Sequence, residues 1–197
     1  MSFFNSFKSD TLAISLGSNL PSAIGSPFNT IINLRPIIEE TICTWIKKNN
    51  FETFNEDSKR NNLRFMWSPL FNTEPIEVNY KQPDFINTVL IIQGKLLQPP
   101  CKESALLLLN EFKNLEIFYG RKKSDQNLEH SPRTLDIDIL WWGNLQVSNH
   151  ELTIPHSRLF TRNFVITPIS KILERTQPIQ ALQSPKGWET DTIIKKL

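Results

Sequence analysis

The most strand-like stretch of the chain is Pro132-Arg133-Thr134-Leu135-Asp136-Ile137-Asp138-Ile139-Leu140-Trp141-Trp142, and the fold is best worked out from it. A strand over 135–142 has a side-chain period of two. It therefore puts Asp136 and Asp138 on one face and the apolar side chains of Leu135, Ile137 and Ile139 on the other. Because the stretch is so apolar and ends in two tryptophans, it predicts a central strand that is mostly covered by other elements.

Two aspartates on a covered strand need an explanation, because Asp is disfavoured in strands and like charges about 7 Å apart repel. A solvated face accounts for most Asp-x-Asp patterns. A covered pair, however, needs compensating cations. Carboxylate ligands without His or Cys suit Mg²⁺, which binds through one or two carboxylates plus substrate phosphates. We therefore expect one or two Mg²⁺ between Asp136, Asp138 and a nucleotide.

Cationic side chains precede this strand. Arg133 lies three residues before Asp136, and Arg121-Lys122-Lys123 lie on the preceding loop. Arg offers paired donors to phosphate oxygens and Lys offers a point charge. Phosphate binding is the better explanation for Arg133, whereas simple solubility explains Lys122 equally well.

Further polar candidates lie on either side. His156 is close in sequence to Arg158 and Arg162, which favours an anion contact, although a lone His is more often a core or capping residue. Glu116 near a predicted helix end is weak evidence of function by itself. Asn87 within the apolar strand 85–92 needs hydrogen-bond partners, and the edge of a heterocyclic ligand would supply them. Phe85 and Phe164 could stack on such a ring, although each is by default a core residue.

The remaining elements follow from hydrophobic period and turn residues. We expect strands over 12–16, 65–71, 85–92 and 135–142, and a long polar connection over 72–84. We expect helices over 28–48, 103–119 and 163–173. Pro36 should kink the first helix or delay its start, and Gly120 should end the second. The order β-α-β-β-α-β predicts an α+β fold: a ferredoxin-like antiparallel sheet with helices packed on both faces. We expect one domain over 1–197, with its core over about 11–173, a polar insertion at about 47–64 and a tail at about 174–197.

Composition excludes several classes. The 197 residues are 39% hydrophobic and 21% charged, with 13 Phe, 5 Trp and a net charge of +2. Disordered, collagen-like and disulfide-scaffold proteins have different compositions. The weak net charge argues against nucleic acid as a partner, and Cys43 and Cys101 lack a zinc-site spacing. No signal peptide or membrane-spanning run is evident. We expect a cytoplasmic protein, without a membrane partner, acting as a monomer.

Taken together, these residues resemble the 6-hydroxymethyl-7,8-dihydropterin pyrophosphokinase family of folate biosynthesis. The resemblance spans about residues 12–173. It rests on the motifs Leu16-Gly17-Ser18-Asn19-Leu20, Phe71-Asn72-Thr73-Glu74-Pro75, Gln82-Pro83-Asp84-Phe85-Ile86-Asn87, Glu116…Gly120-Arg121, Pro132–Ile139, Ile154-Pro155-His156 and Arg162-Asn163-Phe164. The run Pro-Arg-Thr-Leu-Asp-Ile-Asp-Ile is the most specific of them.

The resemblance implies a Mg²⁺-dependent transfer of the ATP diphosphoryl group to the pterin hydroxymethyl oxygen, which releases AMP. It implies that Asp136 and Asp138 bind two Mg²⁺ and that Arg121 and Arg133 neutralise the transferred group. The nucleotide contacts it implies are Glu116, Arg133, Ile139, Thr153, His156 and Arg162. The pterin contacts it implies are Thr73, Glu74, Ile76, Phe85, Asn87, Asp136 and Phe164.

The chain departs from the family pattern at a few positions. His130-Ser131 stands where the family often has Trp-Gly, Glu77 where it has Gly, and Glu151 where some members have Arg. These changes remove no metal ligand. Two other functions stay open at this point: an RNA-binding ferredoxin-like domain, and a catalytically idle relative acting as a scaffold. Release of AMP from ATP in the presence of the pterin separates all three.

Overall fold

The computed structural model describes residues 10–49, 63–78, 80–97, 100–122 and 131–176. Most of the predicted insertion (50–62), most of the predicted tail (177–197), His130 and most of the loop after Arg121 lie outside these residues. The first helix extends to Asn49 and the last helix to Thr176, so both predicted polar segments begin a few residues later than expected. Among the described residues, no helix combines the length and apolar character needed to cross a bilayer.

The centre of the fold is an antiparallel sheet of five strands. Four of them lie in the order β2 (Arg64–Trp67), β4 (Phe85–Gln93), β1 (Thr11–Ser18) and β5 (Asp136–Trp142), and β3 (Phe71–Thr73) also pairs with β4. A small hairpin, β6 (Val147–Ser148) and β7 (Thr153–Ile154), follows β5. The predicted α+β class and antiparallel sheet are confirmed.

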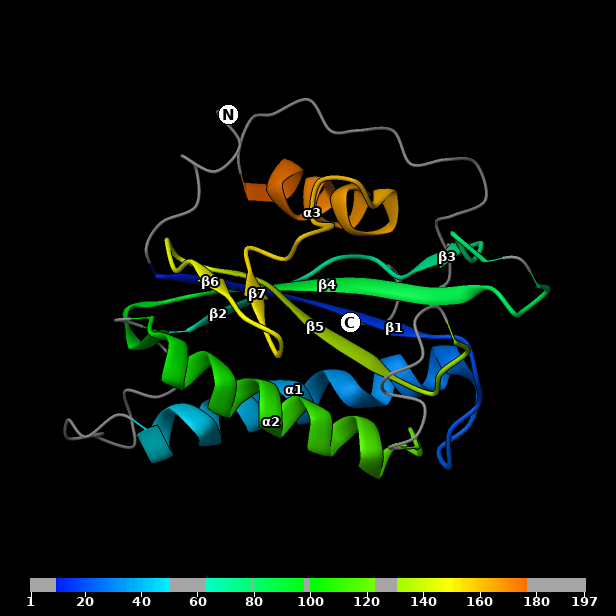
Figure 1. Ribbon diagram of the computed structural model, residues 1–197, viewed down its shortest axis with the longest axis horizontal. Coiled ribbons are helices and arrows are strands. Elements are labelled where there is room, and N and C mark those ends of the chain that lie inside the picture. The colour runs from blue at the N-terminus through cyan, green and yellow to red at the C-terminus, as the bar shows by residue number, and fades with distance from the viewer. Residues whose placement is uncertain (1–9, 50–62, 79, 98–99, 123–130, 177–197) are drawn as a thin grey trace.

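Helices cover both faces of the sheet (Figure 1). The helices α1 (Pro27–Asn49) and α2 (Lys102–Phe118) lie on one face, and α3 (Asn163–Thr176) lies on the other. A single 3-10 turn, Lys95–Leu97, precedes α2. Each face has its own apolar cluster: Ile14, Leu16, Ile137 and Ile139 belong to the larger one, under α1 and α2.

The first helix begins earlier than the delayed start that Pro36 suggested. Ser26 caps it by accepting a hydrogen bond from the Asn29 amide at 3.3 Å, and Pro27 occupies the first helical position, where the missing amide hydrogen costs nothing. The helix then runs through Pro36 without a break in its assignment. A delayed start at Pro36 was therefore wrong, because the capping residue Ser26 lies ten residues earlier.

The second helix ends as its sequence predicts. The Tyr119 amide donates to Leu115 O at 2.9 Å, and Gly120 follows with φ of +96°, the left-handed conformation that favours glycine. A side chain added at Gly120 would still find ordinary space. The glycine therefore serves the backbone turn, which sends the chain back toward the end of α2.

The predicted strand over 65–71 is two strands instead of one. Pro69 lacks an amide hydrogen and cannot continue a strand ladder, so β2 ends at Trp67 and β3 begins at Phe71. Between them, the Ser68 hydroxyl accepts a hydrogen bond from the Val89 amide at 3.0 Å. Asn72 and Thr73 consequently belong to β3 and not to the predicted polar connection.

The sheet face under α3 is divided into an apolar half and a polar half. The apolar half, which packs with α3, contains Ala13, Val89, Ile91, Leu140 and Trp141. The polar half continues along the same strands, where Gly17 pairs with Asp136 and with Asn87, and Ser15 pairs with Asp138. Because α3 covers only the apolar half, the polar half forms the floor of an open site.

Candidate functional site

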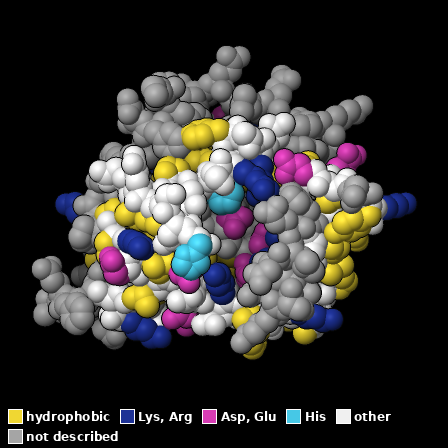
Figure 2. All heavy atoms as spheres, viewed as in Figure 1, with side chains coloured by type: hydrophobic (Ala, Val, Ile, Leu, Met, Phe, Trp, Pro, Cys, Tyr) yellow, Lys and Arg dark blue, Asp and Glu magenta, His cyan; other side chains and the backbone are white. Residues whose placement is uncertain are grey.

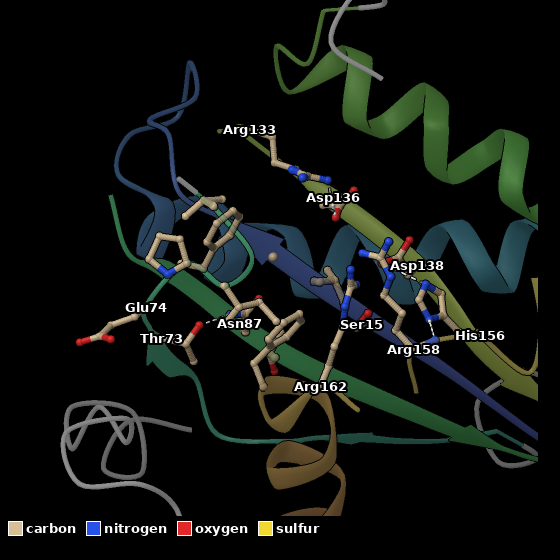
Figure 3. Close-up of a pocket in the computed structure, with 18 of the residues that line it drawn as sticks. Ser15, Thr73, Glu74, Asn87, Arg133, Asp136, Asp138, His156, Arg158 and Arg162 are labelled. Atoms are coloured by element: carbon tan, nitrogen blue, oxygen red, sulfur yellow. Dashed lines mark hydrogen bonds and ion pairs between the residues drawn. The ribbon is translucent and has the colours of Figure 1, made fainter. Parts of the chain in front are cut away.

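One cavity of about 590 Å³ lies over the polar half of the sheet. Figure 2 shows acidic side chains in the hollow at the centre of this face, with basic side chains and histidines around them. Twelve of the residues expected from the sequence line it: Thr73, Glu74, Ile76, Phe85, Asn87, Arg121, Arg133, Asp136, Asp138, His156, Arg162 and Phe164. Residues from five separate parts of the chain thus meet in a single cavity (Figure 3).

Asp136 is held between two arginines at the start of β5. Its Oδ1 accepts from Arg121 Nη1 at 2.7 Å, and its Oδ2 accepts from Arg133 Nη1 at 2.9 Å. The Arg133 side chain is also fixed by its Nε, which donates to Ser131 O at 3.0 Å. Both arginines therefore point their positive charge at the place where the sequence predicted an anion and a metal ion.

Glu116 lies behind this pair, at the end of α2. Its Oε2 accepts from Arg121 Nη1 at 2.7 Å, and its Oε1 accepts from the Ile137 amide at 2.8 Å. Burial and the nearby Asp136 raise the pKa of Glu116 to about 8, while the Arg121 charge and the Ile137 amide act in the opposite direction. With a residue exposure of 4%, Glu116 does not line the cavity.

Asp138 has no arginine within ion-pair distance among the described contacts, in contrast to Asp136. Burial and the charge of Asp136 raise the pKa of Asp138 to about 7, against the opposing effect of Arg162, Arg133 and Arg121. His156 Nε2 lies 4.0 Å from Asp138 Oδ2. Among the described contacts, Asp138 therefore lacks the arginine partners that stabilise the charged form of Asp136.

His156 is neutral at pH 7 and has a defined tautomer. Burial, followed by the charges of Arg162 and Arg158, lowers its pKa. Its Nδ1 accepts a hydrogen bond from the Arg158 amide at 3.1 Å, so the proton of the neutral ring is on Nε2, which faces Asp138. The ring can therefore donate one hydrogen bond into the cavity.

The segment between β7 and α3 adds two arginines to the same cavity, Arg158 and Arg162. Arg158 was not among the predicted site residues, although its position two residues after His156 could have indicated that it lines the site. Arg158 Nη1 lies 3.5 Å from Glu77 Oε2. Glu77 has φ of 57°, the left-handed region that favours glycine, which agrees with the glycine that the family has there.

The opposite wall is suited to a flat polar ring. Asn87 Nδ2 donates to Thr73 Oγ1 at 2.7 Å, and both residues are buried. A Cβ atom on Gly17 would lie 2.8 Å from Asn87 Oδ1, so this glycine leaves room for the amide. Phe85 and Phe164 also line the cavity, and the Arg162 guanidinium lies 5.4 Å from the centre of the Phe164 ring.

Asn19 is a residue of the site that the sequence analysis named only as part of a motif. Its Oδ1 accepts from the Arg133 amide at 2.7 Å, and its Nδ2 donates to Gln82 Oε1 and Pro83 O at 3.0 and 3.1 Å. Asn19 thus ties the segment that carries Arg133 to the segment that leads into Phe85. Only its position in a turn after an apolar strand hinted at this role.

Three expected nucleotide contacts do not line the cavity: Glu116, Ile139 and Thr153. Ile139 is buried on the opposite face of the sheet, in the cluster under α1 and α2. Thr153 is exposed on β7. Glu74 lines the cavity, but its carboxylate points away from Asp136 and Asp138 in Figure 3.

The donor set fits Mg²⁺ held together with a substrate. Within the described residues, no group of three or more His, Cys, Asp or Glu side chains could hold a metal ion by itself. Two carboxylates on one strand face, Asp136 and Asp138, suit an ion whose other ligands are waters and phosphate oxygens. The raised pKa of Asp138 agrees with a carboxylate that lacks a cation at this position.

Comparison with known proteins decides the family. The model of the 7,8-dihydro-6-hydroxymethylpterin-pyrophosphokinase (HPPK) family matches residues 13–174. The chain belongs to the HPPK family. The resemblance drawn from the motifs is therefore confirmed.

Several relatives share part of the HPPK sequence. The 2-amino-4-hydroxy-6-hydroxymethyldihydropteridine pyrophosphokinase of Haemophilus influenzae is 41% identical over 91 residues, which cover 46% of this chain and 51% of the relative. The protein of the same name from Synechocystis is 32% identical over 91 residues, covering 46% and 42%. The mitochondrial folate synthesis bifunctional protein of Arabidopsis thaliana is 36% identical over 106 residues, covering 54% and 17%. The chain thus spans about half, or less, of the relatives it matches.

Proposed function

We propose that this HPPK-family chain transfers the diphosphoryl group of ATP to 6-hydroxymethyl-7,8-dihydropterin, giving AMP and the pterin diphosphate, a step of tetrahydrofolate biosynthesis. The observation that carries this proposal is the cavity itself. It combines two carboxylates on one strand with Arg121, Arg133, Arg158 and Arg162, and it has an amide and two aromatic rings on the opposite wall. This reaction needs an anionic polyphosphate and a polar ring side by side, and the cavity offers both kinds of wall.

In this reaction the hydroxymethyl oxygen forms a bond to the β-phosphorus of ATP. The bond between that phosphorus and the oxygen bridging to the α-phosphorus breaks, AMP departs with the bridging oxygen, and the hydroxyl proton is released. Positioning and charge neutralisation supply most of the acceleration in phosphoryl transfer. Arg121 and Arg133 stand beside Asp136 and would neutralise the transferred group, and Arg162 would bind phosphate oxygens.

Asp136 and Asp138 would hold two Mg²⁺, which would polarise the phosphate oxygens of bound ATP. Neutral His156 would donate its Nε2 hydrogen to the nucleotide. Ile139 and Thr153, which do not line the cavity, stay predicted nucleotide contacts that rest on the resemblance alone, and Glu116 is considered separately below.

The pterin would lie against the opposite wall. Asn87 and Thr73 would recognise its polar edge, since a buried amide oxygen can accept from ring N–H groups. Phe85 and Phe164 would stack on its two faces. Glu74, Ile76 and Asp136 complete the predicted pterin contacts.

The proposal also includes the detailed fold type, the oligomeric state and the cellular location. The strand order β2-β4-β1-β5 supports a ferredoxin-like arrangement. We also propose that residues 1–197 form one domain and that the protein is a cytoplasmic monomer.

The test is release of AMP from ATP by the purified chain with hydroxymethyl-dihydropterin and Mg²⁺. We expect AMP only when all three components are present. An idle relative would bind ATP without releasing AMP, and an RNA-binding domain would bind oligonucleotides in place of the pterin. Either result would overturn the proposal.

A second experiment addresses the roles within the site. Arg133→Ala removes a guanidinium aimed at the transferred group, so we expect kcat to fall by about a hundredfold or more. Pterin affinity, measured by titration calorimetry, should change far less. A variant with normal kcat and only a raised KM would contradict the assignment.

A further inference from the structure

Glu116 is a buried titratable group next to the site that does not line the cavity. Its carboxylate lies at the end of α2, where the helix dipole disfavours negative charge, and burial adds a further cost. Two contacts offset part of these costs, at 2.7 Å to Arg121 Nη1 and at 2.8 Å to the Ile137 amide, although the pKa of Glu116 stays raised to about 8. Both partners are next to Asp136: Arg121 donates a hydrogen bond to its carboxylate, and Ile137 follows it on β5.

The Ile137 contact fixes the backbone between the two aspartates. β5 is the edge strand of the sheet, and it pairs with β1 on one side only. The Ile137 amide therefore has no strand partner, and Glu116 Oε1 takes that place. A carboxylate from a helix thus anchors the strand at the residue that separates Asp136 from Asp138.

The Arg121 contact fixes a guanidinium that faces the cavity. Glu116 binds this residue twice: its carbonyl accepts from the Arg121 amide at 2.9 Å, and its Oε2 accepts from Nη1. The positive φ of Gly120 turns the chain so that both contacts are possible. The same Nη1 donates to Asp136 Oδ1 at 2.7 Å, so Arg121 bridges a carboxylate behind the cavity and one inside it.

From this geometry we infer that Glu116 is a positioning residue that acts through Arg121, and not a nucleotide contact. The inference rests on the proposed function, and it reassigns a residue that the family resemblance placed at the nucleotide. When Asp136 exchanges Arg121 for a ligand, Glu116 still holds the guanidinium at the cavity wall. The side chain of Arg121 then stays oriented toward bound phosphate without a large entropic cost.

The most selective variant is Glu116→Gln. The Gln amide oxygen still accepts from the Ile137 amide, while its NH₂ group meets the donor hydrogens of Arg121 and repels them. We expect the single-turnover rate of AMP formation to fall about tenfold to a hundredfold. The KM for ATP should change less than about threefold, because the residue does not reach the nucleotide. Glu103→Gln, an exposed acid-to-amide change on the same helix, should leave both unchanged.

A double-mutant cycle with Arg121→Met tests whether the effect passes through Arg121. In the Arg121→Met background, Glu116→Gln should lower the single-turnover rate by less than about threefold. Equal losses in both backgrounds would overturn the inference. So would a Glu116→Gln variant with a raised KM for ATP and a normal rate, which would restore the nucleotide contact.

Loss of rate must be separated from loss of folded protein. Thermal unfolding of each variant shows whether the carboxylate matters only for stability, and Glu116→Asp serves if Glu116→Gln does not fold. Asp keeps the charge but is one methylene shorter, so we expect an intermediate loss of rate at an unchanged KM. An Asp variant with the full wild-type rate would contradict the positioning role. If the wild-type chain itself releases no AMP, the proposed function fails, and the inference is judged by a crystal structure of Glu116→Gln. An Arg121 guanidinium that keeps its wild-type position in that structure would overturn it.

Discussion

At the scale of single residues, Asp136 and Asp138 show how one strand creates two different carboxylates. Asp136 has two arginine partners within 3 Å, whereas partial burial and the charge of Asp136 raise the pKa of Asp138 to about 7. One aspartate is therefore neutralised by the protein itself. We expect the other to bind a cation that the protein does not supply.

This difference predicts the effect of Asp138→Asn. We expect AMP formation to fall at least about a hundredfold, since a metal ligand contributes several kcal/mol to the transition state. The fold should be as stable as the wild type at pH 8 or more so, because a poorly compensated charge is removed. Activity and thermal unfolding measured together test this, with exposed Glu40→Gln as the matched control. A variant that keeps its activity, or one that loses its fold, would contradict the metal assignment.

A pH dependence follows from the same carboxylate. Below pH 7 the Asp138 side chain holds a proton that Mg²⁺ must displace, so the affinity for Mg²⁺ with nucleotide should fall as the pH falls through 7, by up to about tenfold per unit. For folding, the folded chain keeps this proton up to about pH 7 while the unfolded chain loses it near pH 4. The stabilising contribution of this proton is therefore lost as the pH rises from about 4 to 7. Calorimetric Mg²⁺ titrations between pH 6 and 8 with no change in affinity would refute the link.

At the scale of elements, the shape of the cavity depends on a glycine in the central strand β1. Gly17 on β1 lies opposite Asn87 on β4 and Asp136 on β5. Its missing side chain is what lets the Asn87 amide reach Thr73 while keeping an oxygen toward the cavity. The pairing of three strands thus sets the shape of one wall.

Gly17→Ala should consequently affect one substrate more than the other. The added Cβ would lie 2.8 Å from Asn87 Oδ1, so the amide must shift by several tenths of an ångström. We expect the KM for the pterin to rise about tenfold or more, and the KM for ATP to change little, as steady-state kinetics would show. Equal effects on both substrates would mean that Asn87 does not mark the pterin wall.

At the scale of the whole molecule, we expect the fold to be independent of a metal ion. The described part of the chain has two apolar clusters on either side of one sheet and no group of three ligand side chains for a structural ion. We therefore expect Mg²⁺ to act in the proposed reaction and not in the scaffold. Nucleotide and metal should stabilise the protein only together.

Thermal unfolding checks this statement. ATP with Mg²⁺ at about a hundred times the dissociation constant should add about 2.7 kcal/mol to the free energy of unfolding. EDTA should abolish this gain and leave the Tm of the ligand-free protein unchanged. A lower Tm of the ligand-free protein after EDTA treatment would reveal a structural metal instead.

Local pattern was enough to predict some of this molecule. The alternation in 135–142 placed Asp136 and Asp138 on one face, and Gly120 ended α2, because both depend on neighbours in sequence. The register shift between β1 and β5 at Ala13/Ile14 and the division of β2 from β3 were missed. Both depend on how one strand pairs with another.

The parts of the site that sequence reasoning missed involve longer distances. Asn19 contacts the Arg133 amide across 114 positions, and nothing in its own neighbourhood indicates that partner. Glu116 is five residues from Arg121, but only the turn at Gly120 brings the two side chains together. Single residue types suggested the chemistry, and tertiary contacts determined which residues carry it.

The central claim is that Asp136 and Asp138 present carboxylates to divalent ions that bind a nucleotide triphosphate. A crystal structure with Mg²⁺ and a non-hydrolysable ATP analogue tests it most directly. The account predicts ion density between these two side chains and the phosphates, with Arg121 still bound to Glu116. Both carboxylates facing only water, with the triphosphate held elsewhere, would contradict it.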